Sequence, residues 1–87
     1  MEQEELDQLW KIVLSEIETE VSRANFLTLF KHTLLLTIDE TTATVAAPSS
    51  MIIDLLQRRF YQIIKKSLDK QTEKNMEILF VPKTIVK

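Results

Sequence analysis

The most informative absence in this sequence is glycine, of which there is none in 87 residues. Phosphate-binding loops and dinucleotide-binding turns need glycine because its backbone lets a ligand approach closely. The GXXG loop with which RNA-binding KH domains clamp a nucleic-acid backbone needs glycine as well. The sequence therefore excludes these motifs, and with them most nucleotide-dependent chemistry.

Cysteine and long apolar runs are also missing. Without cysteine there is no disulfide framework, which agrees with a reducing environment. No apolar run approaches the roughly 20 residues that span a bilayer, and Met1 is followed by acids rather than by a signal sequence. A formal charge of −2 and a pI near 5.4 provide no overall basic field for nucleic acid or anionic lipid. We expect a cytoplasmic protein that does not bind membranes.

Catalytic side chains are scarce. The one histidine, His32, stands at the end of a predicted helix, where interaction with the helix dipole or solvent is more typical than general-base catalysis. The acids are spread along the chain, and neither zinc-ligand spacing nor a Ser/His/Asp arrangement is present. We therefore expect no enzymatic activity, cofactor, metal site or small-molecule substrate.

What the sequence does contain is the composition of one small globular domain, with 45% hydrophobic and 28% charged residues. Hydrophobic periodicity predicts helices at 4–21, 22–31 and 49–68, and strands at 34–38, 43–47 and 76–81. The order α-α-β-β-α-β predicts an α+β fold in which helices pack on a three-stranded sheet. Residues 1–82 would form the domain, and residues 83–87 a tail or the start of a linker.

The predicted third helix has the clearest periodicity. It follows Pro48, and Ser49 or Ser50 is suited to cap its first free N–H groups. One apolar stripe predicts the face that covers the sheet: Ile52, Ile53, Leu56, Phe60, Ile63 and Ile64. Met51 and Leu55 fall among the charged residues opposite. They are either a loose rim of the core or a contact for another molecule.

The predicted first helix carries more apolar surface than one helix normally packs on a small core, and Ile12 lies outside its apolar stripe. Trp10 fits a core position. It also fits an association patch with Leu9 and Ile12, because aromatic residues dominate interface hot spots. The pattern leaves both interpretations open.

Four basic residues of the predicted third helix share the face opposite its apolar stripe: Arg58, Arg59, Lys65 and Lys66. A basic face with an aromatic residue nearby, here Tyr61, can bind single-stranded nucleic acid through phosphates and stacking. A solvated helix surface has the same pattern, and Asp54 and Asp69 dilute the charge. Weak, salt-sensitive binding of single-stranded DNA is therefore an alternative function.

Five short motifs follow one another in an order and spacing typical of a known family: Leu9-Trp10, Phe26 with Phe30, Ala47-Pro48, Asp54-Leu55-Leu56 and Arg59-Phe60. They resemble domain I, the N-terminal domain of the bacterial replication initiator DnaA, over residues 6–81. The resemblance implies the same α-α-β-β-α-β order, a KH-like fold without the GXXG loop. It also implies a non-catalytic module, since the ATPase and duplex-DNA-binding parts of such an initiator are other domains.

The resemblance implies two protein-contact surfaces. The first lies around Leu9, Trp10 and Ile12, and supports weak self-association when initiators assemble at the origin. The second joins the second helix to the start of the third, and binds the replicative helicase or initiation regulators. It is carried onto Asn25, Thr28, Leu29, Ser49 and Met51. A freestanding regulator that mimics domain I is a further interpretation, which only the length of the gene would distinguish.

Overall fold

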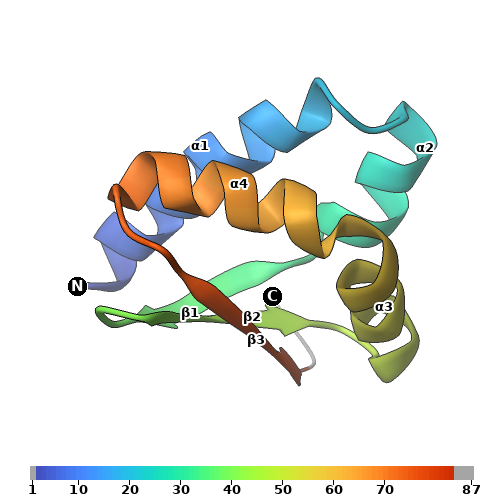
Figure 1. Cartoon of the computed structure of the whole chain (residues 1–87). Helices are drawn as coiled ribbons and strands as arrows, with labels where there is room; N and C mark the ends of the chain where they lie inside the picture. Colours follow the sequence, from blue (N-terminus) through green and yellow to red (C-terminus); the bar gives the residue numbers. More distant parts are fainter. Residues whose placement is uncertain (1, 84–87) are drawn as a thin grey trace.

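The computed structural model describes residues 2–83, and within them the elements follow the order α-α-β-β-α-β. Figure 1 shows the helices on one face of a three-stranded sheet. The helical segments are α1 (Gln3–Glu18), α2 (Arg23–Asn25) with the π-helical turn η1 (Phe26–Phe30), and α3 (Ser50–Leu55) with the π-helical turn η2 (Leu56–Phe60) and α4 (Tyr61–Thr72). The predicted α+β class is confirmed. Of the predicted tail at 83–87, residues 84–87 lie outside the described residues.

The sheet has the strand order β1-β2-β3. Strand β1 (Leu34–Ile38) is antiparallel to β2 (Thr42–Ala47), and β3 (Glu77–Pro82) is parallel to β2. The register of β1 shifts between Leu35 and Thr37, whose partners Val45 and Thr44 are adjacent. This bulge places both Leu35 and Ile38 on the side of the helices, because one extra residue changes the alternation of the strand.

Serine caps begin two of the helices, and the one at the third helix is predicted from the sequence. Ser22 Oγ accepts a hydrogen bond from the Asn25 N–H (3.1 Å), and Ser49 Oγ accepts one from the Ile52 N–H (3.3 Å). Of the two serines after Pro48, Ser49 is therefore the cap. The cap directs the chain out of β2 and into the first turn of α3.

The two π-helical turns change the phase of the helices. A π turn contains one more residue than an α turn. The side chains after it are therefore rotated back around the helix axis, relative to their positions in an uninterrupted α-helix. In η1 the Lys31 N–H donates to the Phe26 carbonyl oxygen (3.1 Å). At the end of η2, Phe60 leaves helical geometry (φ −121°, ψ 2°), and α4 runs in a different direction from α3 (Figure 1). The predicted third helix therefore bends at Phe60, and it continues to Thr72.

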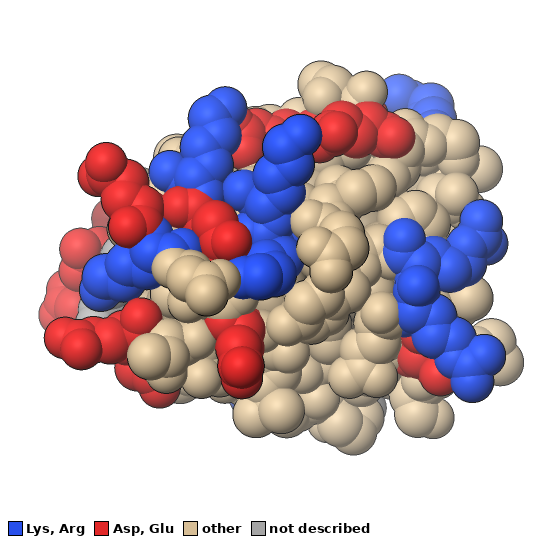
Figure 2. Space-filling model, viewed as in Figure 1, with Lys and Arg blue, Asp and Glu red and all other residues tan. Residues whose placement is uncertain are grey.

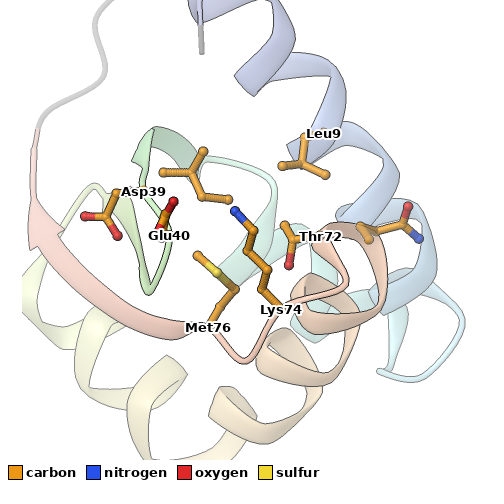
Figure 3. Close-up of a pocket in the computed structure, with 8 residues that line it drawn as sticks. Leu9, Asp39, Glu40, Thr72, Lys74 and Met76 are labelled. Carbon is orange, nitrogen blue, oxygen red and sulfur yellow. The ribbon is translucent and has the colours of Figure 1, made fainter.

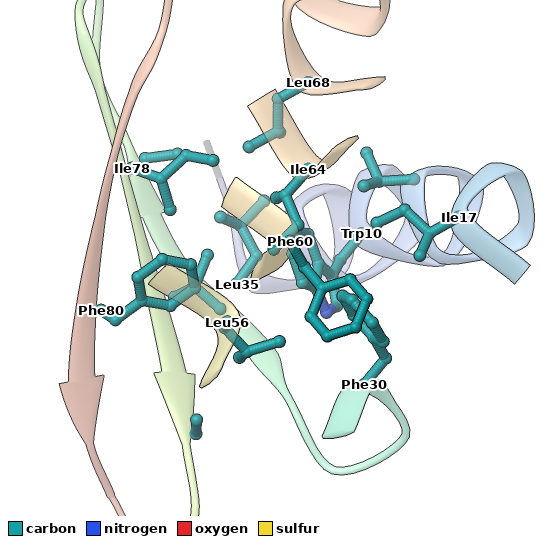
Figure 4. Close-up of a cluster of buried hydrophobic side chains, with 14 of the residues drawn as sticks. Trp10, Ile17, Phe30, Leu35, Leu56, Phe60, Ile64, Leu68, Ile78 and Phe80 are labelled. Carbon is teal, nitrogen blue, oxygen red and sulfur yellow. The ribbon is translucent and has the colours of Figure 1, made fainter. Parts of the chain in front are cut away.

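The core lies between the helices and the inner face of the sheet (Figure 4). Four residues at intervals of four are all buried from η2 to the end of α4: Leu56, Phe60, Ile64 and Leu68. In a straight α-helix such a series would rotate away from one face, and the backward rotation introduced by η2 offsets that rotation. The outer face of the sheet is open, and Leu79 of β3 is 54% exposed there. None of the helices described between residues 2 and 83 has the length and hydropathy needed to cross a membrane.

A polar network joins α1 to α4. Glu16 of α1 accepts hydrogen bonds from Ser67 Oγ (2.5 Å), Lys70 Nζ (3.0 Å) and Gln71 Nε2 (3.2 Å). These donors, Ser67 first, lower the pKa of the Glu16 carboxyl below its ordinary value, because they favour the ionised form. The network therefore contributes stability that depends on pH.

We expect Glu16→Gln to reduce the pH dependence of stability in the acid range. A lowered folded-state pKa means that the contribution of Glu16 is complete above the pKa of an unfolded glutamate and is lost as pH falls through the folded value. The wild type should therefore be more stable than Glu16→Gln at neutral pH, and the difference should shrink on acidification. Urea unfolding at a series of pH values measures it. Glu18→Gln, on the opposite side of α1, is the matched control, and an equal response in both variants would contradict the prediction.

Candidate protein-interaction surfaces

The residues of the first predicted surface, on α1, differ in how far they are exposed. Trp10 is 3% exposed, and its indole Nε1 donates a hydrogen bond to Thr33 Oγ1 (3.0 Å). The Thr33 hydroxyl in turn donates to the Phe30 carbonyl oxygen (2.6 Å). The interpretation of Trp10 as a core residue is thus confirmed, and its side chain supports α1 from inside. Ile12, in contrast, is 48% exposed on the outside of α1.

Leu9, the third residue of that surface, lines a hollow of about 460 Å³ that we call the Leu9 pocket (Figure 3). Its lining comes from α1, the β1–β2 turn, the end of α4 and the loop before β3: Leu9, Ile38, Asp39, Glu40, Gln71, Thr72, Lys74 and Met76. Aliphatic and thioether groups form its floor, and charged groups stand at its rim. The sequence did not predict this pocket, because the residues that line it come from three distant stretches of the chain, at residue 9, residues 38–40 and residues 71–76.

The rim of the Leu9 pocket carries both signs of charge. Asp39 Oδ1 accepts hydrogen bonds from the backbone N–H groups of Thr41 (2.9 Å) and Thr42 (2.7 Å), which hold the turn between β1 and β2. These two bonds lower the pKa of Asp39, so the carboxylate is negative at neutral pH. Glu40 and Lys74 are exposed beside it. The pocket therefore has an apolar floor and a rim with two acids and one base.

The second predicted surface contains the most exposed large hydrophobic residue in the described part of the chain. Met51, in the first turn of α3, is 73% exposed. Asp54 and Arg58, three and seven residues later, continue the same side of the helix, and they form an ion pair of 3.0 Å between Arg58 Nε and Asp54 Oδ1. The Arg59 guanidinium lies 5.5 Å from the centre of the Phe60 ring. We call Met51, Asp54, Arg58 and Arg59 the Met51 corner.

The remaining residues of the second surface differ in exposure. Thr28 is exposed, and Asn25 and Ser49 are partly buried. Leu29 is only 5% exposed and belongs to the core, whereas Leu27 is 40% exposed. The prediction that Leu29 lies at the surface, which the resemblance implied, is wrong, because Leu29 lies three residues after Phe26 on the inward side of the helix. Leu27 is the exposed leucine of this segment.

The second helix and the start of the third lie at the same end of the molecule (Figure 1). Phe30 of η1 and Phe60 of η2 connect them, with ring centres 5.4 Å apart and an interplanar angle of 77°. The structure thus brings the exposed Thr28 and Met51 to one end.

The four basic residues predicted to share a face are separated. Arg58, Arg59 and Lys66 are exposed. Lys65 instead holds the loop before β3, because its Nζ donates to Asp69 Oδ2 (3.1 Å) and the Met76 carbonyl oxygen (2.8 Å). The bend at Phe60 explains why Lys65 does not continue the side of Arg58. On the face seen in Figure 2, the basic side chains form separate groups with acids among them.

The described residues contain no arrangement that suggests metal chemistry: within 2–83, no three Asp, Glu or His side chains are grouped to hold a metal ion.

Comparison with known proteins points to replication initiators. The family model described as the DnaA N-terminal domain matches residues 7–70, an interval that contains Leu9, Ile12 and the Met51 corner.

A full-length relative agrees with the family match. Over 61 residues the chain is 43% identical to the chromosomal replication initiator protein DnaA of Thermomicrobium roseum. The aligned region covers 70% of this chain and 13% of that relative. The similarity therefore concerns a small part of a much longer protein.

Proposed function

Because this chain belongs to the DnaA N-terminal domain family, we propose that it is a non-catalytic interaction module of a bacterial replication initiator. In this proposal it recruits the replicative helicase or regulators of initiation at the origin, and it also associates with itself. Family membership supports a role in replication initiation. The exposed apolar residues support the proposal that this role is carried out through contact with other proteins.

The observation that carries the proposal is the exposure of Met51. A side chain that is 73% exposed leaves apolar surface in water, and a protein partner could cover that surface. Methionine suits such a contact, because its unbranched, polarisable side chain adapts to different partner surfaces. The Ser49 cap fixes the backbone from which Met51 projects, so little conformational entropy is lost when a partner binds.

We expect Met51→Glu to weaken capture of the replicative helicase or of an initiation regulator by about tenfold or more, as for truncation of a hot-spot residue. A carboxylate at this position would be desolvated by any partner that covers the methionine. The measurement is a titration of the purified partner on the immobilised chain.

The matched control is Leu79→Glu, which introduces the same charge at an exposed aliphatic residue on the outer face of the sheet. Both variants should retain the wild-type free energy of unfolding to within about 0.5 kcal/mol, because both side chains are mainly in solvent. Equal partner affinity of Met51→Glu and wild type would remove Met51 from the contact.

A further inference from the structure

The molecule carries an apolar projection and an apolar hollow at opposite ends. Met51 lies at the start of α3, at the end that Figure 1 shows on the right. The Leu9 pocket lies at the other end, where the first turns of α1, the β1–β2 turn and the end of α4 meet. A Met51 side chain therefore cannot enter the pocket of its own copy. It can enter only that of another copy.

The two ends also differ in charge. The rim of the Leu9 pocket has the acids Asp39 and Glu40 and one base, Lys74, and the first turns of α1 carry the further acids Glu4, Glu5 and Asp7. The Met51 corner has Arg58 and Arg59, with Asp54 as its acid. Figure 2 shows one group of basic side chains over the end that carries α3, and acidic and basic side chains intermixed towards the opposite end. The two arginines of the corner and the two acids of the rim are thus opposite in sign, which favours contact between the corner of one molecule and the rim of the next.

We propose that copies of this chain associate head to tail, with the Met51 corner of one copy seated in the Leu9 pocket of the next. The proposal rests on the self-association in the proposed function and gives that association a geometry. Met51 would contact the apolar floor formed by Leu9, Ile38 and Met76. Arg58 and Arg59 would face the acids of the rim, and Lys74 would face Asp54.

The size of the pocket fits this occupant. A hollow of 460 Å³ lies within the range of about 300–1,000 Å³ that accommodates small-molecule ligands, so it can accept a methionine side chain together with its immediate neighbours. Leu9 then takes part in self-association as part of the floor of the pocket.

A contact between two different patches has a consequence that a symmetric dimer does not. Each copy keeps one unused corner or pocket, so association continues into open chains, or into a ring if the rotation closes. A symmetric contact between two α1 helices through Ile12 would stop at the dimer.

Sedimentation velocity with a corner variant and two pocket variants tests the proposal. Met51→Glu replaces the apolar side chain of the Met51 corner with a carboxylate. Leu9→Glu places a carboxylate on the apolar floor, and Glu40→Lys reverses a rim charge on an exposed turn where folding is not at risk. The mass of the wild type should rise beyond that of a dimer as concentration approaches the millimolar range. The association constant of each variant alone should be lower than that of the wild type by about tenfold or more.

The decisive sample is an equal mixture of Met51→Glu with a pocket variant. The first retains an intact pocket and the second an intact corner, so the mixture should form a one-to-one dimer and stop there. A mixture that stays monomeric would overturn the head-to-tail contact. Leu79→Glu, outside both surfaces, is the control and should associate like the wild type.

The outcomes also separate this contact from self-association as such. A wild type that stops at the dimer and is dissociated by Ile12→Glu would overturn the head-to-tail geometry and leave the proposed self-association standing. A wild type that stays monomeric up to millimolar concentration would overturn both, while recruitment of the helicase is still decided by the titration with Met51→Glu.

Discussion

Trp10→Ala is expected to lower the free energy of unfolding by about 3–5 kcal/mol, the usual cost of truncating a buried tryptophan. Trp10 is 3% exposed, so its removal leaves a cavity under α1. It also leaves Thr33 Oγ1 without the hydrogen bond donated by the indole. Since small domains are stable by only about 5–15 kcal/mol, a large part of the total would be lost. Urea unfolding followed by circular dichroism measures the change.

Two further substitutions separate the role of Trp10 in the core from a role in contact. Trp10→Phe keeps most of the volume and loses the N–H donor, so it should cost less than Trp10→Ala. Ile12→Ala, on the exposed side of the same helix, should change the free energy of unfolding by about 0.5 kcal/mol or less. If Trp10→Ala kept its stability to within about 1 kcal/mol and lost self-association, Trp10 would be a contact residue instead.

Phe30→Ala is expected to have an effect of similar size, about 3–5 kcal/mol. Phe30 is fully buried, and its ring packs against those of Phe26, with centres 6.1 Å apart, and Phe60, at 5.4 Å. The substitution thus opens a cavity where the second and third helices meet. Thermal and urea unfolding should both show the loss. Phe26→Ala, at a partly buried position, is the matched control and should cost less.

A double-mutant cycle on Phe30 and Phe60 isolates their direct contact. An edge-to-face pair contributes about 0.5–1.5 kcal/mol beyond the burial of each ring, so the double variant should lose less than the sum of the single variants. Strict additivity would show that the two π-helical turns are held together by the surrounding core rather than by this pair.

Much of the fold follows from local sequence. Ser49, one of the two predicted caps, begins the third helix, and the three strands lie within one residue of their predicted bounds. The π-helical turns do not follow from it. The resemblance placed Leu29 on the contact surface, whereas its side chain is buried three residues after Phe26 and next to Phe30, as expected for the inward side of a helix.

One part of the candidate site could be predicted from local sequence, and the other part depends on tertiary packing. The outward direction of Met51 is a local property of one amphipathic turn, and its predicted position on the solvent side agrees with its exposure. The Leu9 pocket depends on how α1, a hairpin turn and the end of α4 meet, and this is decided by tertiary packing. Lys65 is a similar case, since its bonds to the loop before β3 become visible only when the loop is in place.

The parallel pairing of β2 with β3 has a consequence for biosynthesis. Strand β2 is central in the sheet, and its second neighbour comes only after the whole third helix, so β2 lacks that partner until the end of the domain has left the ribosome. The local hairpin of β1 and β2 can pair early, but the distant β3 pairing carries a larger entropic cost of loop closure. One edge of β2 therefore stays without its partner strand during synthesis until β3 has emerged.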